Sequence, residues 1–251
     1  MTWTSYLDWF HRTRSGITEE VLVRADGAGM NPYAWLLDGL PTDRGVVALD
    51  VACGSGPLRA NSVGRRWVGI DRSTGELALA ARRAPGGLVL GDVMALPFAD
   101  ASVDLVACSM ALMLFDPVDR ALAEIRRVLA DGGLAVFLLP GSIPLTARDR
   151  FRYLRLVAAL HELQPAYPTR IHRGRLRARL ARAGLVTIRD DRRRFAFALH
   201  DEHAARRFVE SLYVPGRQTA RVDGAARLAS RWVGSEIGIP LRRIVCQKQT
   251  P

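Results

Sequence analysis

Residues 46–71 read VVALDVACGSGPLRANSVGRRWVGID, and this stretch decides the fold. An apolar run leads to Asp50, a turn that contains Gly54 and Gly56 follows, and a second apolar run ends at Asp71. This order predicts a strand, a tight turn, a short helix and a second strand, which together form the first unit of a doubly wound α/β sheet. Because ligands of such sheets bind at the carboxyl ends of the strands, the turn and the two acids form the first candidate site.

The same residues indicate a ligand that contains a nucleoside. Glycines let the backbone turn sharply and approach a ligand closely, and an acid about 20 residues beyond the loop can accept hydrogen bonds from both hydroxyls of a ribose. NAD is disfavoured because Arg59 stands where the dinucleotide motif needs a third small residue. A carboxylate at Asp50 would repel a pyrophosphate, but it suits a ligand with an ammonium and a sulfonium, such as S-adenosyl-L-methionine (SAM).

Three stretches, taken together, resemble the class I SAM-dependent methyltransferases. They are DVACGSG at residues 50–56, GDVMALPFADASVDLV at residues 91–106 and EIRRVLADGG at residues 124–133. In this order and spacing they are similar to the ubiquinone and menaquinone methyltransferase-like branch, methyltransferase type 11. The resemblance implies a Rossmann-like, doubly wound, mostly parallel seven-stranded sheet with an N-terminal helical lid and a helical insertion before the last strand.

The resemblance also implies which residues bind SAM and its product, S-adenosyl-L-homocysteine. Asp71 would accept hydrogen bonds from the ribose and Asp92 one from the adenine amino group, while Val93 and Met94 would flank the adenine ring. The full set of expected cofactor contacts is Asp50, Ala52, Cys53, Gly54, Gly56, Asp71, Arg72, Asp92, Val93, Met94 and Ser109. No metal site is expected.

Three consecutive segments of one domain are expected along the chain. Residues 1–45 would form the N-terminal helical lid, residues 46–145 the SAM-binding core, and residues 146–251 the rest of the sheet with a helical substrate cap. Within the last segment, residues 201–213 and 219–237 are predicted to be the two helices inserted before the final strand. In proteins of the resembled family, such helices cover the cofactor and the substrate pocket.

The middle of the chain contains a clear helical period. It starts at Val118 and is predicted to run through Leu129 until Gly132 and Gly133 stop it. A buried strand is then expected at residues 134–139.

A further helix is predicted over residues 146–163, with Phe151, Leu154, Ala158 and His161 along one packing face. On that face, His161 would either be a structural histidine whose polar atoms are satisfied within the packing, or it would reach into the substrate pocket. The second alternative makes it a candidate for catalysis.

Methyl transfer from SAM requires little from the protein, because the sulfonium is already activated and the acceptor must only be positioned. A phenol or a carbon acid needs a base, whereas an amine need only be neutral. Many members of the resembled family carry a histidine pair after the fourth strand, where this chain has Met113 and Leu114, so a general base in that loop is in doubt. His161 and Tyr6 are the candidate catalytic residues, because each lies on an element expected to border the pocket.

Length and composition limit the class of protein to which the chain can belong. A chain of 251 residues can bury a sizeable core. It has neither an apolar run of about 20 residues nor a signal-peptide pattern, so a cytoplasmic protein without a membrane span is expected. The cysteines are odd in number and scattered, which predicts neither a disulfide framework nor a zinc site.

The leading hypothesis is a SAM-dependent methyltransferase that methylates oxygen or carbon of a small, apolar or aromatic metabolite. The net charge of +11 motivates an RNA methyltransferase as the alternative. A nucleic acid partner is nevertheless disfavoured, because the charge is almost all arginine without interleaved stacking aromatics, which is typical of a solvated basic face. A third hypothesis is a SAM-binding homologue that transfers no methyl group. Whether the chain forms a homodimer stays open.

Overall fold

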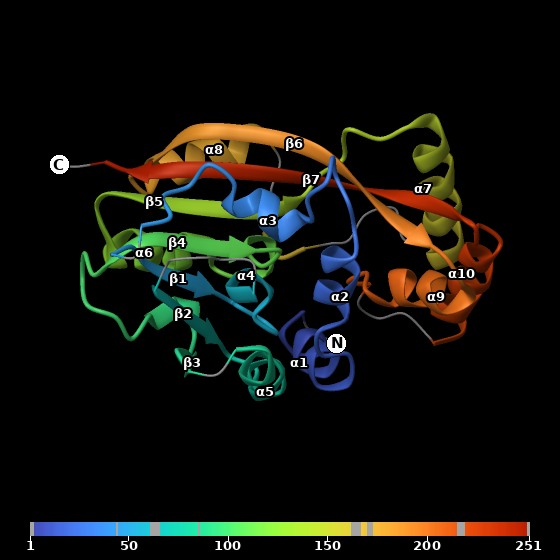
Figure 1. Ribbon diagram of the computed structural model, residues 1–251, viewed down its shortest axis with the longest axis horizontal. Coiled ribbons are helices and arrows are strands. Elements are labelled where there is room, and N and C mark those ends of the chain that lie inside the picture. Colours follow the sequence, from blue (N-terminus) through green and yellow to red (C-terminus); the bar gives the residue numbers. More distant parts are fainter. Residues whose placement is uncertain are drawn as a thin grey trace. The chain divides into compact units, whose positions relative to one another are not determined.

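The computed structural model describes residues 3–43, 45–60, 66–84, 86–161, 167–169, 173–214 and 219–249. A seven-stranded sheet has the order β3-β2-β1-β4-β5-β7-β6 and is flanked by helices (Figure 1). The strands are β1 (Val47–Val51), β2 (Arg66–Asp71), β3 (Leu88–Leu90), β4 (Val103–Ser109), β5 (Leu129–Pro140), β6 (Leu185–Leu199) and β7 (Ser235–Lys248). The pairings among β1 to β5 are parallel, and Figure 1 shows β7 running against β1 and β4. The predicted Rossmann-like, mostly parallel α/β sheet is confirmed.

Helices precede, connect and follow these strands. They are α1 (Trp3–Thr13), α2 (Ile17–Val23), α3 (Pro32–Leu37), α4 (Pro57–Ala60), α5 (Thr74–Arg83), α6 (Val118–Val128), α7 (Ala147–Leu160), α8 (Arg173–Arg182), α9 (Glu202–Glu210) and α10 (Thr219–Ser230), with 3-10 turns η1 (Val93–Ala95) and η2 (Leu112–Leu114). Helices α1, α2 and α3 precede the first strand, where helical structure is predicted, and the two helices predicted before the last strand are present as α9 and α10. In the part of the chain that the structure describes, no helix is long and apolar enough to cross a membrane.

The chain forms two compact units that do not follow chain order. The first comprises Met1–Pro32, Gly141–Ala166 and Arg192–Leu241, and the second comprises Tyr33–Pro140, Tyr167–Asp191 and Arg242–Pro251. The candidate cofactor residues therefore lie in the second unit, whereas α1, α2, α7, α9 and α10 belong to the first. The role of residues 1–45 as a lid stays a prediction.

The core of the second unit joins the sheet to α6. Val118, Leu122 and Ile125 project from one side of α6 and are at most 3% exposed, and they pack in one cluster with buried side chains of β1, β4 and β5. Burial of each such side chain contributes about 1.5–3 kcal/mol. The predicted end of this helix was wrong, because α6 ends at Val128 and Leu129 already pairs with β4 as the first residue of β5. A leucine that suits the buried side of a helix also suits a buried strand, so the apolar period could not place this boundary.

The packing face predicted for α7 was also wrong. Phe151 and Leu154 are 58% and 67% exposed, while Asp149 and Arg152 are buried. The helix has a capping box, in which Thr146 and the Asp149 side chain bond to one another's backbone N–H groups. His161 is the C-cap residue at the end of the helix, in a left-handed conformation. Long-range hydrogen bonds of Asp149 and Arg152 hold their side of the helix inward, so the predicted face points outward.

The second inserted helix is shorter than predicted. It ends at Ser230, and the chain passes through Gly234, whose φ is +81°, before β7 begins at Ser235. The Gly234 backbone N–H donates to the carbonyl of Leu199 at 2.8 Å. A glycine in the left-handed region ends the helical stretch at low cost, because it carries no Cβ.

Candidate functional site

The loop between β1 and α4 is wound tightly. Ala52, Gly54 and Gly56 all have positive φ, at 54°, 53° and 73°, and the Gly56 N–H donates to the Cys53 carbonyl at 2.9 Å. A Cβ added to Gly56 would lie 3.1 Å from the Cβ of Ala80 in α5. A left-handed alanine costs on the order of 1–3 kcal/mol. The loop therefore holds a strained conformation, which is common at ligand-binding loops.

Asp71 ends β2 and fixes this loop. Its Oδ2 accepts a hydrogen bond from the Gly54 N–H at 2.9 Å, and its Oδ1 accepts one from the Ser73 N–H at 2.8 Å. The contact forms because β1 and β2 are parallel neighbours, with Val51 opposite Ile70. Asp71 is half-buried, and a carboxylate has about four acceptor positions, so it can accept further hydrogen bonds. The sequence predicted the acid but not its contact with the glycine loop.

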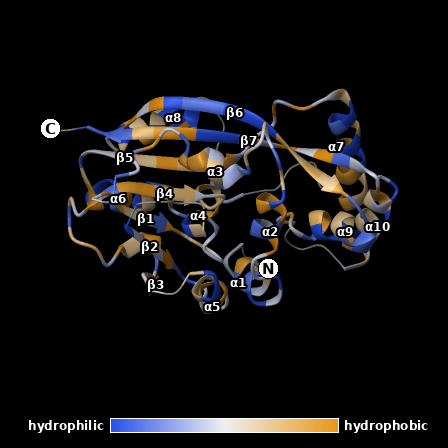
Figure 2. Cartoon of the chain, viewed as in Figure 1, coloured by the Kyte–Doolittle hydropathy of each residue, from blue (hydrophilic) through white to orange (hydrophobic). Residues whose placement is uncertain are grey.

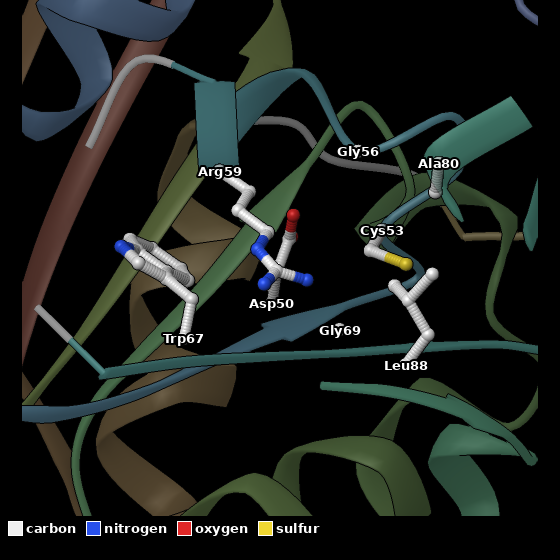
Figure 3. Close-up of a pocket in the computed structure, with 8 residues that line it drawn as sticks. All are labelled: Asp50, Cys53, Gly56, Arg59, Trp67, Gly69, Ala80 and Leu88. Carbon is white, nitrogen blue, oxygen red and sulfur yellow. The ribbon is translucent and has the colours of Figure 1, made fainter. Parts of the chain in front are cut away.

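Asp50 points into a small pocket on one face of the sheet (Figure 3). The pocket is lined by Asp50, Cys53, Gly56, Arg59, Trp67, Gly69, Ala80 and Leu88. Asp50 is 3% exposed, and Figure 3 shows the Arg59 side chain entering the same pocket. Arg59 is thus a residue of this site that sequence reasoning used only to exclude NAD, and the expected contact of Asp50 with SAM stays a prediction.

The predicted adenine-binding residues follow β3. The Oδ1 of Asp92 accepts a hydrogen bond from the Met94 N–H at 2.9 Å and caps η1. Asp92 is exposed, Met94 is half-buried and Val93 is buried. The Gly91 N–H donates to the Asp71 carbonyl at 3.0 Å, so the end of β2 lies beside the residues that follow β3. The structure therefore brings Asp71 and Asp92 to the same edge of the sheet, as parallel strands require.

Ser109 ends β4, on the other side of β1. Its hydroxyl is buried, and it has no hydrogen-bond partner among the residues that the structure describes. Such a hydroxyl costs about 1–3 kcal/mol unless something satisfies it. Met110 follows with φ of +55°. The end of β4 thus carries a buried hydroxyl, that of Ser109, that could bond a ligand, next to a residue in the strained left-handed conformation.

All the predicted cofactor contacts lie in the second unit, at or after the carboxyl ends of β1 to β4. After β1 come Ala52, Cys53, Gly54 and Gly56, with Asp50 within the strand; β2 supplies Asp71, followed by the exposed Arg72; β3 is followed by Asp92, Val93 and Met94; and β4 ends at Ser109. Their individual contacts with a cofactor stay predictions.

The loop after β4 is where many members of the resembled family carry a histidine pair. In this chain the position holds a buried apolar side chain. Met113 is 0% exposed. Thr169, which sequence reasoning missed, donates its N–H to the Met113 carbonyl at 3.1 Å and its hydroxyl to the Phe115 carbonyl at 2.8 Å. These bonds hold the segment before α8 against η2. No motif in the sequence could have indicated them, because they join positions 54 and 56 residues apart.

The two predicted catalytic residues lie in the first unit. Tyr6 is 4% exposed, and its hydroxyl accepts a hydrogen bond from the Val214 N–H at 3.0 Å. Burial raises the pKa of Tyr6 above its usual value, although the hydrogen bond from Val214 opposes this. His161 is exposed. A catalytic role for either residue stays a prediction.

The cysteines are buried thiols that take part in no disulfide. Burial raises the pKa of Cys246 to about 11 and also raises that of Cys108, so both thiols remain protonated and unreactive at neutral pH. Across the described ranges, no group of three or more His, Cys, Asp or Glu side chains could hold a metal ion.

Comparison with known sequences places residues 49–137 in a family model described as a methyltransferase domain. A demethylmenaquinone methyltransferase of Thermobifida fusca (strain YX) is 37% identical over 114 residues, which cover 42% of this chain and 48% of that protein. A 2-phytyl-1,4-naphthoquinone methyltransferase of Thermosynechococcus vestitus is 34% identical over 111 residues, 41% and 49% of the two chains. The chain spans about half the length of these curated relatives.

A solved structure shares the fold over nearly the whole chain. The cyclase SpnF superposes with a TM-score of 0.63 at 19% identity and covers 98% of this chain and 95% of its own. Identity this low shows the fold alone. Together with the strand order and the matched segment, it leads to one conclusion: residues 49–137 match the methyltransferase domain family, and the chain has a Rossmann-like fold.

Proposed function

We propose that this chain is a SAM-dependent methyltransferase that methylates oxygen or carbon of a small apolar or aromatic metabolite. The observation that carries the proposal is the hydrogen bond between the Asp71 carboxylate and the Gly54 N–H, at the adjoining ends of β1 and β2. It lies inside the segment that matches the methyltransferase domain. The substrate class is supported by two relatives whose names denote quinone methylation.

The residues at this edge of the sheet fit SAM. The half-buried carboxylate of Asp71 suits the ribose hydroxyls, and Asp92 suits the adenine amino group. Val93 and Met94 offer apolar atoms for the faces of the ring. The buried hydroxyl of Ser109, which has no partner among the described residues, would be satisfied by a polar group of the ligand. When bound, SAM would supply an activated methyl group on a sulfonium.

The chain's own contribution to the reaction is chiefly to position the acceptor. The segment 109–115, SMALMLF, contains no histidine or carboxylate, so a proton of the acceptor must leave by another route. The raised pKa of Tyr6 keeps its phenol neutral at pH 7, which suits a hydrogen-bond donor that orients the acceptor better than a base. His161 is then the remaining candidate base, unless the acceptor ionises by itself.

Calorimetric titration with SAM and with S-adenosylhomocysteine tests the cofactor site, and we expect micromolar binding of both. Transfer of labelled methyl from SAM should then be measured on quinols, phenols and stabilised carbon acids, with RNA as a separate substrate. Absence of binding to either ligand would contradict the proposal. Binding without transfer to any acceptor would favour the non-methylating homologue, and transfer to RNA would favour the alternative substrate class.

A further inference from the structure

Helix α7 turns an apolar face outward. Phe151 and Leu154 are 58% and 67% exposed, and Ile143, shortly before the helix, is 43% exposed. On the opposite side, Asp149 and Arg152 are only 1% and 4% exposed. The same buried side carries Leu156 and Leu160, at 1% and 4% exposed, so α7 packs one apolar side inward and exposes further large apolar side chains on the other. An ordinary surface helix has charged and polar residues on its outer side. Large apolar side chains that lie exposed next to one another are typical of an interaction surface.

Fixed hydrogen bonds hold α7 in this orientation. The Asp149 carboxylate accepts hydrogen bonds from the Thr146 hydroxyl at 2.7 Å, from the Gly238 N–H at 2.8 Å and from the Arg194 Nε at 2.7 Å. All four residues belong to the first unit. A carboxylate with three such donors cannot leave the interior without leaving them unpaired. The outward direction of Phe151 and Leu154 is therefore set by the fold.

Arginines flank the apolar centre on both sides. At about 100° per residue, Leu154 lies about 60° from Phe151, Arg150 about 40° beyond Leu154, and Arg155 about 40° beyond Phe151. The Arg155 guanidinium lies 5.7 Å from the centroid of the Phe151 ring. Arg148 is also exposed, and Figure 2 shows hydrophobic and hydrophilic residues interspersed along α7. We call these five residues the outward face of α7.

The charge of the outward face limits what can cover it. Within Ala147–Leu160 the single acid is Asp149, which is buried, so the face carries three positive charges and no negative one. Two copies of such a face would repel one another across a symmetric interface, which disfavours a second copy of the chain. An apolar centre with arginines at its edges matches a helix that lies in a membrane interface, where the arginine stems follow the apolar surface and the guanidiniums reach the headgroups.

We propose that the outward face of α7 docks on an anionic lipid surface. Phe151 and Leu154 would enter the boundary between headgroups and acyl chains, and the three arginines would contact lipid phosphates. The choice of a lipid surface over an acidic protein rests on the proposed function, because one relative is named for a phytyl-substituted quinone. An acceptor with such an apolar chain resides in a bilayer, so a docked enzyme would meet it there.

Sedimentation of the full chain with lipid vesicles tests this proposal. We expect binding to vesicles of phosphatidylglycerol and phosphatidylcholine in equal parts, and binding at least about tenfold weaker to phosphatidylcholine alone. The double variant Phe151→Gln/Leu154→Gln should weaken binding to the anionic vesicles by about tenfold or more. Arg150→Gln/Arg155→Gln should weaken it and reduce its dependence on salt.

Matched variants outside α7 serve as controls. Ile188→Gln changes an apolar residue of β6 that is 56% exposed, and Arg82→Gln/Arg83→Gln removes two exposed charges from α5. Neither control should change vesicle binding by more than about twofold, because neither lies on the proposed surface. All of the substituted side chains are exposed, so the variants should fold, which thermal unfolding checks.

Four outcomes would overturn the proposal: equal binding to both vesicles, an equal loss in the Ile188→Gln control, no vesicle binding, or a dimer that the Phe151→Gln/Leu154→Gln variant dissociates. SAM titration of the same samples separates this proposal from the proposed function. Vesicle binding without SAM binding would leave the docking surface standing and remove the enzymatic assignment. SAM binding without vesicle binding would do the reverse.

Discussion

At the scale of single residues, Asp71 shows how one side chain combines structure and chemistry. Its carboxylate accepts from the N–H groups of Gly54 and Ser73 at 2.9 and 2.8 Å. These two bonds connect the end of β2 to the glycine loop and to the start of α5. An acid that the sequence predicts as a ribose acceptor is therefore also the residue that shapes the loop around the expected ligand.

Replacement of Asp71 should accordingly weaken cofactor binding. We expect Asp71→Ala to reduce SAM affinity at least about tenfold, because hydrogen bonds to a charged group contribute about 1.5–3 kcal/mol each. Calorimetry measures the effect. Asp104→Ala is the control, because Asp104 also accepts a backbone N–H, that of Val47 at 2.8 Å, but at the start of β1. Unchanged SAM affinity in Asp71→Ala would contradict the placement of the nucleoside.

At the scale of elements, a polar cluster in the first unit orients α7. Burial alone would raise the pKa of Asp149, but hydrogen bonds from Arg194, Thr146 and Gly238 outweigh it and hold the pKa well below its usual range. Next to it, the Arg152 guanidinium lies 5.1 Å from the centroid of the Trp232 ring. The cluster thus ties α7 to β6, β7 and the end of α10 within one unit.

Loss of this carboxylate should destabilise the protein. We expect Asp149→Asn to lower the free energy of unfolding by about 3 kcal/mol at pH 7, since it removes the buried negative charge that accepts hydrogen bonds from Thr146, Gly238 and Arg194. Arg194 would keep its second partner, Glu236, at 3.0 Å. Because the pKa is lowered in the folded state, the stabilisation is complete above the unfolded pKa of about 3.9 and disappears as pH falls through the folded pKa. The difference between variant and wild type should therefore shrink below about pH 4, as measured by denaturant unfolding across pH.

A surface ion pair provides the comparison. Asp223 and Arg206 are 2.7 Å apart, with 33% and 44% of their side chains exposed. Asp223→Asn should cost less than about 1 kcal/mol, because solvent screens such pairs. An Asp149→Asn variant no less stable than Asp223→Asn would show that the polar cluster does not hold α7.

At the scale of the whole molecule, the net charge of +11 is the balance of 36 lysines and arginines against 25 acids. Many arginines pair with carboxylates, for example Arg127 with Asp100 and Glu124, Arg194 with Asp149, Arg206 with Asp223, Arg207 with Glu20, Arg242 with Asp190, and Arg243 with Asp191. Much of the arginine content thus has a structural role.

This distribution predicts the behaviour of the chain toward RNA. We expect association that falls steeply with added salt, as for unspecific contacts with phosphates, and no incorporation of labelled methyl into RNA under conditions in which a metabolite is methylated. Filter binding across salt concentrations and a methyl-incorporation assay measure the two effects. Methyl transfer to RNA would contradict the assignment to small molecules.

The sequence by itself determined the sheet, the glycine loop and the acids at its edge. Alternating elements, Gly54 and Gly56 and the apolar runs before Asp71 and Asp92 are local features, and parallel strands necessarily bring their carboxyl ends to one edge. The order of these features in the chain therefore sufficed to predict both the fold and the edge at which the candidate site lies.

The tertiary structure alone decided the orientation of α7, the start of β5 at Leu129 and the placement of Asp50 and Arg59 in one pocket. Apolar periodicity predicts which side chains could be buried, but partners distant in the chain select among the possibilities. The bond from Gly238 to Asp149 joins residues 89 positions apart. Such a contact forms only once the chain has folded, and it turned Phe151 and Leu154 from the expected core to the surface.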